Sequence, residues 1–174
     1  MMKSPFSRSE GFTVVELLVA LGVVALLVAI LVPSFEAFRE RGRKVKCISH
    51  MRTIHTGLLG YYNDHGHWPQ MGDEKFDHTE EEFFRFWVEE TKPYGTSEET
   101  WICPSDRVLE RMMNEDEDMV YGSYIVTRFD KMAQTPFRWN QPWAMERGNF
   151  HRTGSHVLMP DGSVNSTRNP FYGR

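Results

Sequence analysis

The chain has 174 residues, which suits one folded domain with an appendage, and its hydrophobic (40%) and charged (25%) fractions are ordinary for a globular protein. Its net charge of −4 argues against a general nucleic-acid-binding protein, which should be basic. The two cysteines, Cys47 and Cys103, exclude a disulfide-rich scaffold and form no zinc-type cluster in sequence. Spacing alone leaves open whether they pair or remain two buried thiols.

The first predicted element is a membrane helix. Residues 12–32 are apolar except for Glu16, and about 20 such residues cross a bilayer as a helix. A secretory signal has a shorter apolar core and a small-x-small cleavage site after it, and this segment has neither. Charge conflicts with an exported domain, because Lys3 and Arg8 precede the segment and a larger basic group follows it. That group is Arg39, Arg41, Arg43, Lys44 and Lys46.

A second helical pattern follows Pro33, which we expect to bend the helix rather than end it. The helix should stop near 63–66, where Asn63, Asp64 and Gly66 supply breaker and cap chemistry. Apolar residues recur mostly at spacings of three, four or seven, which predicts one buried stripe. They are Phe35, Phe38, Val45, Ile48, Met51, Ile54, Leu58 and Tyr61 or Tyr62.

The remainder is predicted to be a small α+β domain. Thr79 and Glu82 have the spacing of a capping box, so a short helix is expected around 80–90. The other expected elements are a loop over 91–118 with one helical turn near 107–113, a strand over 123–129, an irregular loop over 131–149, and two short strands joined by the Pro-Asp-Gly turn at 160–162.

The run Gly11-Phe12-Thr13-Val14-Val15-Glu16-Leu17-Leu18-Val19 resembles the leader motif of type IV prepilins and type II secretion pseudopilins. The resemblance implies that a membrane aspartyl peptidase cuts after Gly11 and then methylates the amine of Phe12. It also implies that Glu16 pairs with the amine of a neighbouring subunit and sets the filament register. A lone acid is costly inside a membrane, so it usually marks function. The alternative is an uncleaved anchor whose acid reaches the headgroups.

Later segments resemble pseudopilin G-like proteins, including members from planctomycete and verrucomicrobial bacteria. Residues 47–54 and 60–69 are similar to a C-x-x-N-L-x-x-I…Y-x-x-D-x-G-x-[FYW]-P pattern, with His50 and Met51 in place of Asn and Leu. Residues 101–106 are similar to a W-x-C-P-x-D segment. His151 followed by Asp161-Gly162 is similar to an H-x9-D-G ending. The pattern residues are Tyr61, Asp64, Gly66, Pro69, His151, Asp161 and Gly162.

The resemblance implies a pilin-like α+β fold, in which a long bent N-terminal helix packs on a small antiparallel sheet. We expect a leader (1–11), a transmembrane and filament-core helix (12–32), its amphipathic second half (33–65) and a globular domain (66–174). The implied function is that of a structural subunit of a pseudopilus or pilus-like filament, not an enzyme. A membrane-anchored envelope domain with a binding or enzymatic role is the alternative.

The implied location is the bacterial inner membrane, with one spanning helix and a periplasmic domain that later joins the filament. The implied partners are the prepilin peptidase and methyltransferase, other pilin or pseudopilin subunits, and the inner-membrane assembly platform. If the domain is exported, Cys47 and Cys103 lie where disulfides form.

The sequence also contains candidate metal-binding and catalytic residues. Asp161, Ser163 and Asn165 alternate as oxygen donors, and the resemblance makes calcium the cofactor to consider, although EF-hand spacing is absent. Transition-metal binding by His65 and His67 beside Asp64, or by His151 and His156, lacks a closed ligand set of known spacing. Ser155, His156 and Asp161 could form a triad, but no nucleophile-elbow motif accompanies them.

Overall fold

The structure is a computed structural model, and it describes residues 12–72, 79–107, 121–138, 140–151 and 154–167. The chain divides into two compact units, residues 1–39 and 40–174, and the division falls inside the long first helix. The leader, including Gly11, and the expected helical turn near 107–113 (apart from residue 107) lie outside the described residues.

Helix α1 (Val14–His65) is one continuous element that runs through Pro33. It begins with a capping box that the sequence analysis did not predict: Thr13 N donates to Glu16 Oε2 (2.9 Å), and Glu16 N donates to Thr13 Oγ1 (3.2 Å). It ends where predicted, because Gly66 adopts a positive φ of 73° and its N–H bonds to Tyr62 O.

The first unit exposes the apolar side chains of α1. From Val14 to Val32 they are 51–74% exposed, apart from the small residues, so nothing in the described part of the chain covers them. The helix is long and apolar enough here to cross a membrane. This part of α1 therefore gains no stability from a core within its own chain.

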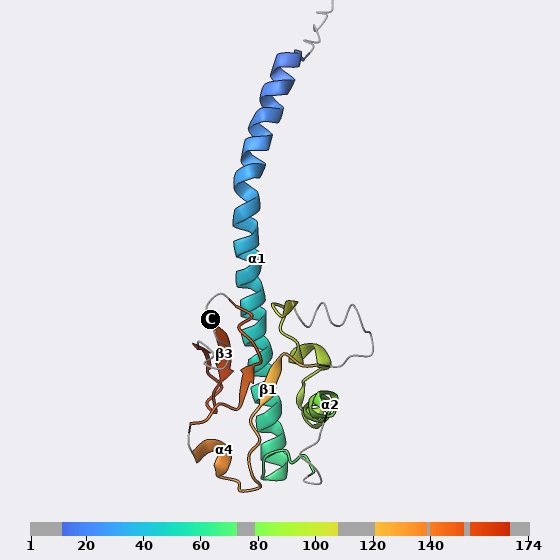
Figure 1. The fold of residues 1–174 in the computed structure, drawn as a ribbon, viewed down its shortest axis with the longest axis vertical. Coiled ribbons are helices and arrows are strands. Elements are labelled where there is room, and N and C mark those ends of the chain that lie inside the picture. The colour runs from blue at the N-terminus through green and yellow to red at the C-terminus, as the bar shows by residue number, and fades with distance from the viewer. Residues whose placement is uncertain (1–11, 73–78, 108–120, 139, 152–153, 168–174) are drawn as a thin grey trace, which may run out of the picture. The chain divides into compact units, whose positions relative to one another are not determined.

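In the second unit, α1 supplies one side of the core (Figure 1). The predicted stripe is confirmed at Met51, Ile54, Leu58 and Tyr61, which are buried. It is wrong at Phe35 and Phe38 in the first unit and at Val45 in the second, which are 59%, 73% and 66% exposed; Cys47 takes the buried position near Val45.

The neighbouring segments approach α1 closely at two glycines. A Cβ on Gly57 would lie 2.7 Å from Thr96 Cγ2, and one on Gly60 would lie 2.6 Å from Tyr94 Cδ1. Both distances are shorter than real Cβ contacts, so these positions need glycine for the helix to pack.

Helix α2 (Glu80–Thr91) confirms the predicted short helix and its capping box between Thr79 and Glu82. It buries Phe84, Trp87 and Val88 in the core. Two 3-10 turns follow, η1 (Lys92–Tyr94) and η2 (Glu98–Trp101).

The sheet has four antiparallel strands in the order β1-β2-β3-β4. The predicted strand at 123–129 is confirmed as β1 (Tyr124–Val126), and the predicted hairpin as β3 (Ser155–Leu158) and β4 (Val164–Thr167). The expectation of an irregular loop over 131–149 is wrong in part, because this stretch holds α4 (Thr135–Arg138) and β2 (Ala144–Glu146).

Strand β2 forms because of its tertiary contacts rather than its local sequence. Its three residues pair with β1 on one side and β3 on the other, with Ile125 opposite Met145 and Ala144 opposite Leu158. Pro142 and Gly148 flank it and give this stretch the local pattern of a loop. Pairing with two neighbours outweighs that local preference.

Indole rings fill the centre of the second unit. Trp68, Trp87, Trp101 and Trp143 are each at most 2% exposed. Trp68 lies edge-on to Trp143, and their indole N–H groups bond to Thr127 O (3.0 Å) and Pro136 O (2.9 Å) respectively. These aromatic side chains therefore serve packing.

Candidate functional site

Phe12 and Glu16 are the described part of the predicted processing region. Phe12 is 83% exposed just before α1. Glu16 Oε2 accepts bonds from both Thr13 N (2.9 Å) and Thr13 Oγ1 (2.8 Å). Glu16 therefore caps its own helix, a role that a Thr-x-x-Glu pattern could have signalled in the sequence.

Cys47 on α1 and Cys103 after η2 form a disulfide, with their Cα atoms 5.2 Å apart and a sequence separation of 56. Both residues are buried. In the chain-entropy model, closing a loop of this length stabilises the fold by about 4 kcal/mol. The bond joins the second half of α1 covalently to the loop before β1.

Glu146 is the centre of a buried polar cluster beside this disulfide, although it lies in a strand that the sequence analysis missed. It is 0% exposed at the end of β2. Its Oε1 accepts from His151 Nε2 (3.1 Å) and His156 Nδ1 (3.0 Å), and its Oε2 accepts from the backbone N–H of His156 (2.7 Å). Three donors thus converge on one carboxylate.

Glu146 is held as a carboxylate. Burial raises its pKa, but the hydrogen bonds from His151 and His156 outweigh this, and the net shift is downward. A buried negative charge is costly unless it is paired. Hydrogen bonds from the two imidazole rings, whose centroids lie 4.5 Å apart, compensate the buried carboxylate.

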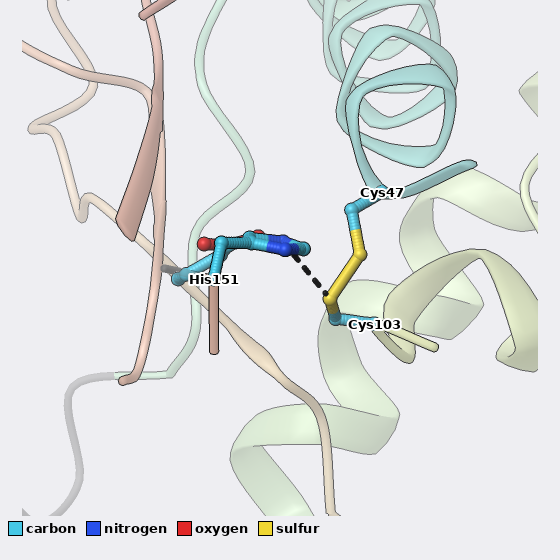
Figure 2. A group of neighbouring side chains, drawn as sticks. Cys47, Cys103 and His151 are labelled. Carbon is cyan, nitrogen blue, oxygen red and sulfur yellow. Dashed lines mark hydrogen bonds and ion pairs between the residues drawn. A yellow bond between two sulfur atoms is a disulfide. The ribbon is translucent and has the colours of Figure 1, made fainter. Parts of the chain in front are cut away.

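His151 connects the cluster to the disulfide and to α1. Its Nε2 lies 3.6 Å from Cys103 Sγ, and Figure 2 shows the ring pointing at that sulfur. Its Nδ1 lies 3.4 Å from Glu40 Oε1, an ion-pair separation rather than a short hydrogen bond. Glu40 also accepts from Ser105 Oγ at 3.3 Å. The His of the H-x9-D-G pattern therefore lies against the Cys of the W-x-C-P-x-D segment.

The acid of the W-x-C-P-x-D segment also has a structural role here. Asp106 Oδ2 accepts from Ser123 Oγ (2.9 Å), and the same hydroxyl accepts from Cys103 N (2.9 Å). His50, in the place of the pattern's Asn, donates from Nδ1 to Ile102 O (3.0 Å). Burial lowers the pKa of His50, so its ring is neutral at pH 7. Both contacts position the backbone around Cys103.

The residues of the Tyr61–Pro69 pattern form the C-terminal end of α1 and the turn that follows it. Tyr61 is buried, and its ring stacks on His65 at 4.0 Å. Asp64 Oδ2 accepts from Tyr94 Oη (3.0 Å), which ties the end of α1 to η1. Pro69 is buried beside Trp68.

The two histidines of this turn have local partners. His65 Nδ1 bonds to Tyr61 O (3.0 Å), and His67 Nδ1 bonds to Trp68 O (2.9 Å). Each of these bonds occupies the Nδ1 atom of its ring. Among the described residues, the one group of metal-ligating side chains that converges lies elsewhere, at Cys47, Cys103, Glu146 and His151.

The Asp161-Gly162 turn packs on α1. Gly162 has a φ of 78°, and a Cβ there would lie 3.2 Å from His55 Cε1. His55 Nε2 donates to Pro160 O (2.9 Å), and its ring stacks on Trp143. The glycine is required both by its backbone angle and by this close approach.

The contacts of Asp161 and His156 bear on the candidate calcium site and on the candidate triad. Asp161 Oδ1 accepts from Ser163 N (2.9 Å), an ordinary turn bond, while Asn165 lies exposed on β4; calcium at these three residues stays a prediction. The triad, which lacked a supporting motif in the sequence, is also contradicted by the contacts: His156 is buried and bonded to Glu146, whereas Asp161 is bonded to Ser163.

The chain is similar to curated pilins and to a competence protein. The type IV major pilin PilA of Myxococcus xanthus is 22% identical over 38% of this chain and 30% of the pilin. The type IV major pilin PilE1 of Neisseria gonorrhoeae is 28% identical over 35% of this chain and 37% of the pilin. Competence protein ComGC of Halalkalibacterium halodurans is 29% identical over 39% of this chain and 67% of that protein.

No protein-family model matches the chain, and no solved structure matches it significantly. The chain spans about a third of the length of these pilins. The fold nevertheless agrees with the prediction from the sequence: a long N-terminal helix and a small antiparallel sheet of four strands. The chain has weak homology to type IV pilins and to ComGC, and its fold is pilin-like.

Proposed function

We propose that this chain is a structural subunit of a type II secretion pseudopilus or type IV pilus-like filament. The observation that carries the proposal is α1 from Val14 to Val32, where the apolar side chains are exposed and Glu16 is the single acid. Such a surface needs a lipid or protein environment from outside the chain. The membrane provides the lipid environment before assembly, and neighbouring subunits provide the protein environment afterwards.

The proposed processing is a cut after Gly11 and methylation of Phe12 by the prepilin peptidase. The exposure of Phe12 and its position before the helix are compatible with access by an enzyme. The chain is a substrate in this reaction and not the catalyst. Its further proposed partners are other pilin or pseudopilin subunits and the inner-membrane assembly platform.

The proposed location is the inner membrane, with the second unit in the periplasm. The disulfide supports an oxidising compartment. The conflicting basic group after the membrane segment is partly neutralised, because Arg43 pairs with Glu40 (3.5 Å) and Lys46 pairs with Glu99 (2.7 Å).

Mass spectrometry of the protein extracted from membranes tests the processing step. We expect the mature chain to begin with N-methylated Phe12, and Gly11→Val to abolish the mass change. Gly42→Val is a matched control, because Gly42 lies in α1, well after the proposed cut, with open space around its Cβ position. A Gly11→Val protein of the same mature mass as the wild type would contradict the proposed cut.

The register role of Glu16 must be separated from its capping role. Glu16→Gln keeps a side-chain oxygen for Thr13 but removes the charge, whereas Glu16→Ala removes both. If charge pairing sets the register, both variants lose incorporation into filaments. Normal incorporation of Glu16→Gln together with loss in Glu16→Ala assigns Glu16 to capping and excludes the charge-based register.

A further inference from the structure

The disulfide and the buried carboxylate–histidine cluster together contain the donor atoms of a metal site. One donor atom each from Cys47, Cys103, Glu146 and His151 lies within 4.8 Å of all the others, and all four residues are buried. Two thiolates, one imidazole and one carboxylate are ligands that Zn²⁺ takes in tetrahedral sites. The sequence concealed this set because its members come from four separate segments.

Two of the distances between these donor atoms approach tetrahedral spacing. With Zn–S bonds of about 2.3 Å and Zn–N bonds of about 2.0–2.1 Å, a tetrahedron places N and S about 3.6 Å apart and N and O about 3.4 Å apart. His151 Nε2 lies 3.6 Å from Cys103 Sγ and 3.1 Å from Glu146 Oε1. What prevents binding is the covalent bond between the sulfurs, which removes both thiolates.

We propose that the thiol form of this chain binds one Zn²⁺ through Cys47, Cys103, His151 and Glu146, and that disulfide formation abolishes the site. The chain is synthesised with thiols, so this form precedes the disulfide. Zinc binding by the two thiols releases two protons and leaves the zinc in its divalent state. Oxidation of the metal-free thiols transfers two electrons and two protons to an exogenous disulfide, which becomes two thiols.

The side chains that contact the proposed ligands, Glu40 and His156, support this assignment. If His151 Nε2 binds the ion, its proton lies on Nδ1, which faces Glu40 Oε1 at 3.4 Å. A carboxylate behind a metal-binding imidazole is a common outer-shell arrangement. Glu146 keeps its bonds from His156 Nδ1 (3.0 Å) and His156 N (2.7 Å), which orient the carboxylate.

Cobalt titration of the full chain in detergent tests the proposal. The protein is stripped of metal and reduced with a phosphine, which takes up one oxygen from water for each disulfide cleaved to two thiols. We expect one Co²⁺ per reduced chain, with a thiolate-to-cobalt charge-transfer band and intense tetrahedral d–d bands. Zn²⁺ should displace the cobalt and raise the Tm of the reduced chain. The oxidised chain should show neither band.

Variants separate this site from binding by the two cysteines alone. His151→Gln and Glu146→Gln should lower the zinc affinity of the reduced chain at least tenfold, and Glu40→Gln should lower it by about 10–100-fold as an outer-shell change. His67→Gln is the matched control and should leave the affinity unchanged, because His67 lies outside the cluster. Unchanged affinity in both His151→Gln and Glu146→Gln overturns the proposal.

If reduction of the disulfide partly unfolds the chain, circular dichroism can still test the proposal. A reduced chain that unfolds without metal and regains its near-ultraviolet aromatic signal with Zn²⁺ supports the site, since metal binding then drives folding. A reduced chain that remains unfolded with Zn²⁺, or that folds without giving a thiolate–cobalt band, overturns it.

Discussion

The two parts of α1 have opposite surroundings although they belong to one helix. In the first unit, Val14 and Leu31 are 74% and 69% exposed, whereas in the second unit Met51 and Leu58 are 0% exposed. The acids differ in the same way, because Glu16 is exposed at the helix start and Glu146 is fully buried beside the second half of the helix. The second half is held by its own core, while the first half requires partners from outside the chain.

Loss of the buried carboxylate should weaken the second unit most. Glu146→Ala leaves His151 and His156 without their acceptor, and breaking a buried pair of this kind costs about 3–5 kcal/mol. Urea unfolding of the full chain in detergent, followed by near-ultraviolet circular dichroism, measures the loss. Glu146→Gln is the control, since it keeps an acceptor oxygen and should cost less.

Removing the covalent connection to α1 should have an effect of similar size. The double variant Cys47→Ser, Cys103→Ser should lower the free energy of unfolding by about 4 kcal/mol in the chain-entropy model. The same urea experiment measures it, with the wild type under oxidising conditions as reference. A loss below about 1 kcal/mol would show that the unfolded chain is already restricted around these residues.

A matched pair of leucines tests the comparison itself. Leu58→Ala should cost about 2–5 kcal/mol, because it leaves a cavity in the core. Leu31→Ala should cost less than about 0.5 kcal/mol in the unassembled chain, because its side chain has no core to leave. Equal losses from the two substitutions would disprove the division of α1 into a self-supported and an unsupported part.

The smallest expected effect concerns Tyr124, whose hydroxyl is buried and has no hydrogen-bond partner among the described residues. Burial, followed by the charges of Glu146 and Asp106, raises the pKa of Tyr124. The unfolded tyrosine ionises first, so stability should fall by up to about 1.4 kcal/mol per pH unit above about pH 10.

Tyr124→Phe should remove that part of the alkaline loss and change stability at pH 7 by less than about 1 kcal/mol, since no bond to a described residue is broken. Urea unfolding at pH 7, 10 and 11 measures both effects. Tyr62→Phe is the control for an exposed hydroxyl, which donates to Ala133 O. An alkaline loss that persists unchanged in Tyr124→Phe would assign it to other groups.

The sequence predicted features that depend on local chemistry. Thr79 and Glu82 indicated a helix start, Gly66 a helix end, and Pro160-Asp161-Gly162 a hairpin, because each acts within a few residues of itself. It did not predict β2, whose three residues have no strong strand pattern and depend on pairing with β1 and β3.

The buried cluster was hidden for the same reason. His151 and Cys103 could be assigned to motifs, but their contact across 48 residues depends on tertiary packing. Glu146 looked like a loop acid, and its burial follows from its place at the end of the central strand β2. The alternation of Ala144, Met145 and Glu146 places the acid on the same face as a small apolar residue, which is the weak signal that was available.

The bond between Cys47 and Cys103 also determines how a mechanical load would pass through the molecule. A pull applied along α1 from its N-terminal end reaches a covalent link at Cys47 before it reaches the packed side chains of Met51, Ile54 and Leu58. Tension is therefore shared with the loop at Cys103 and the strand that follows it, instead of peeling the helix away one contact at a time. A filament built from such subunits would resist extension through its covalent chain as well as through its packing.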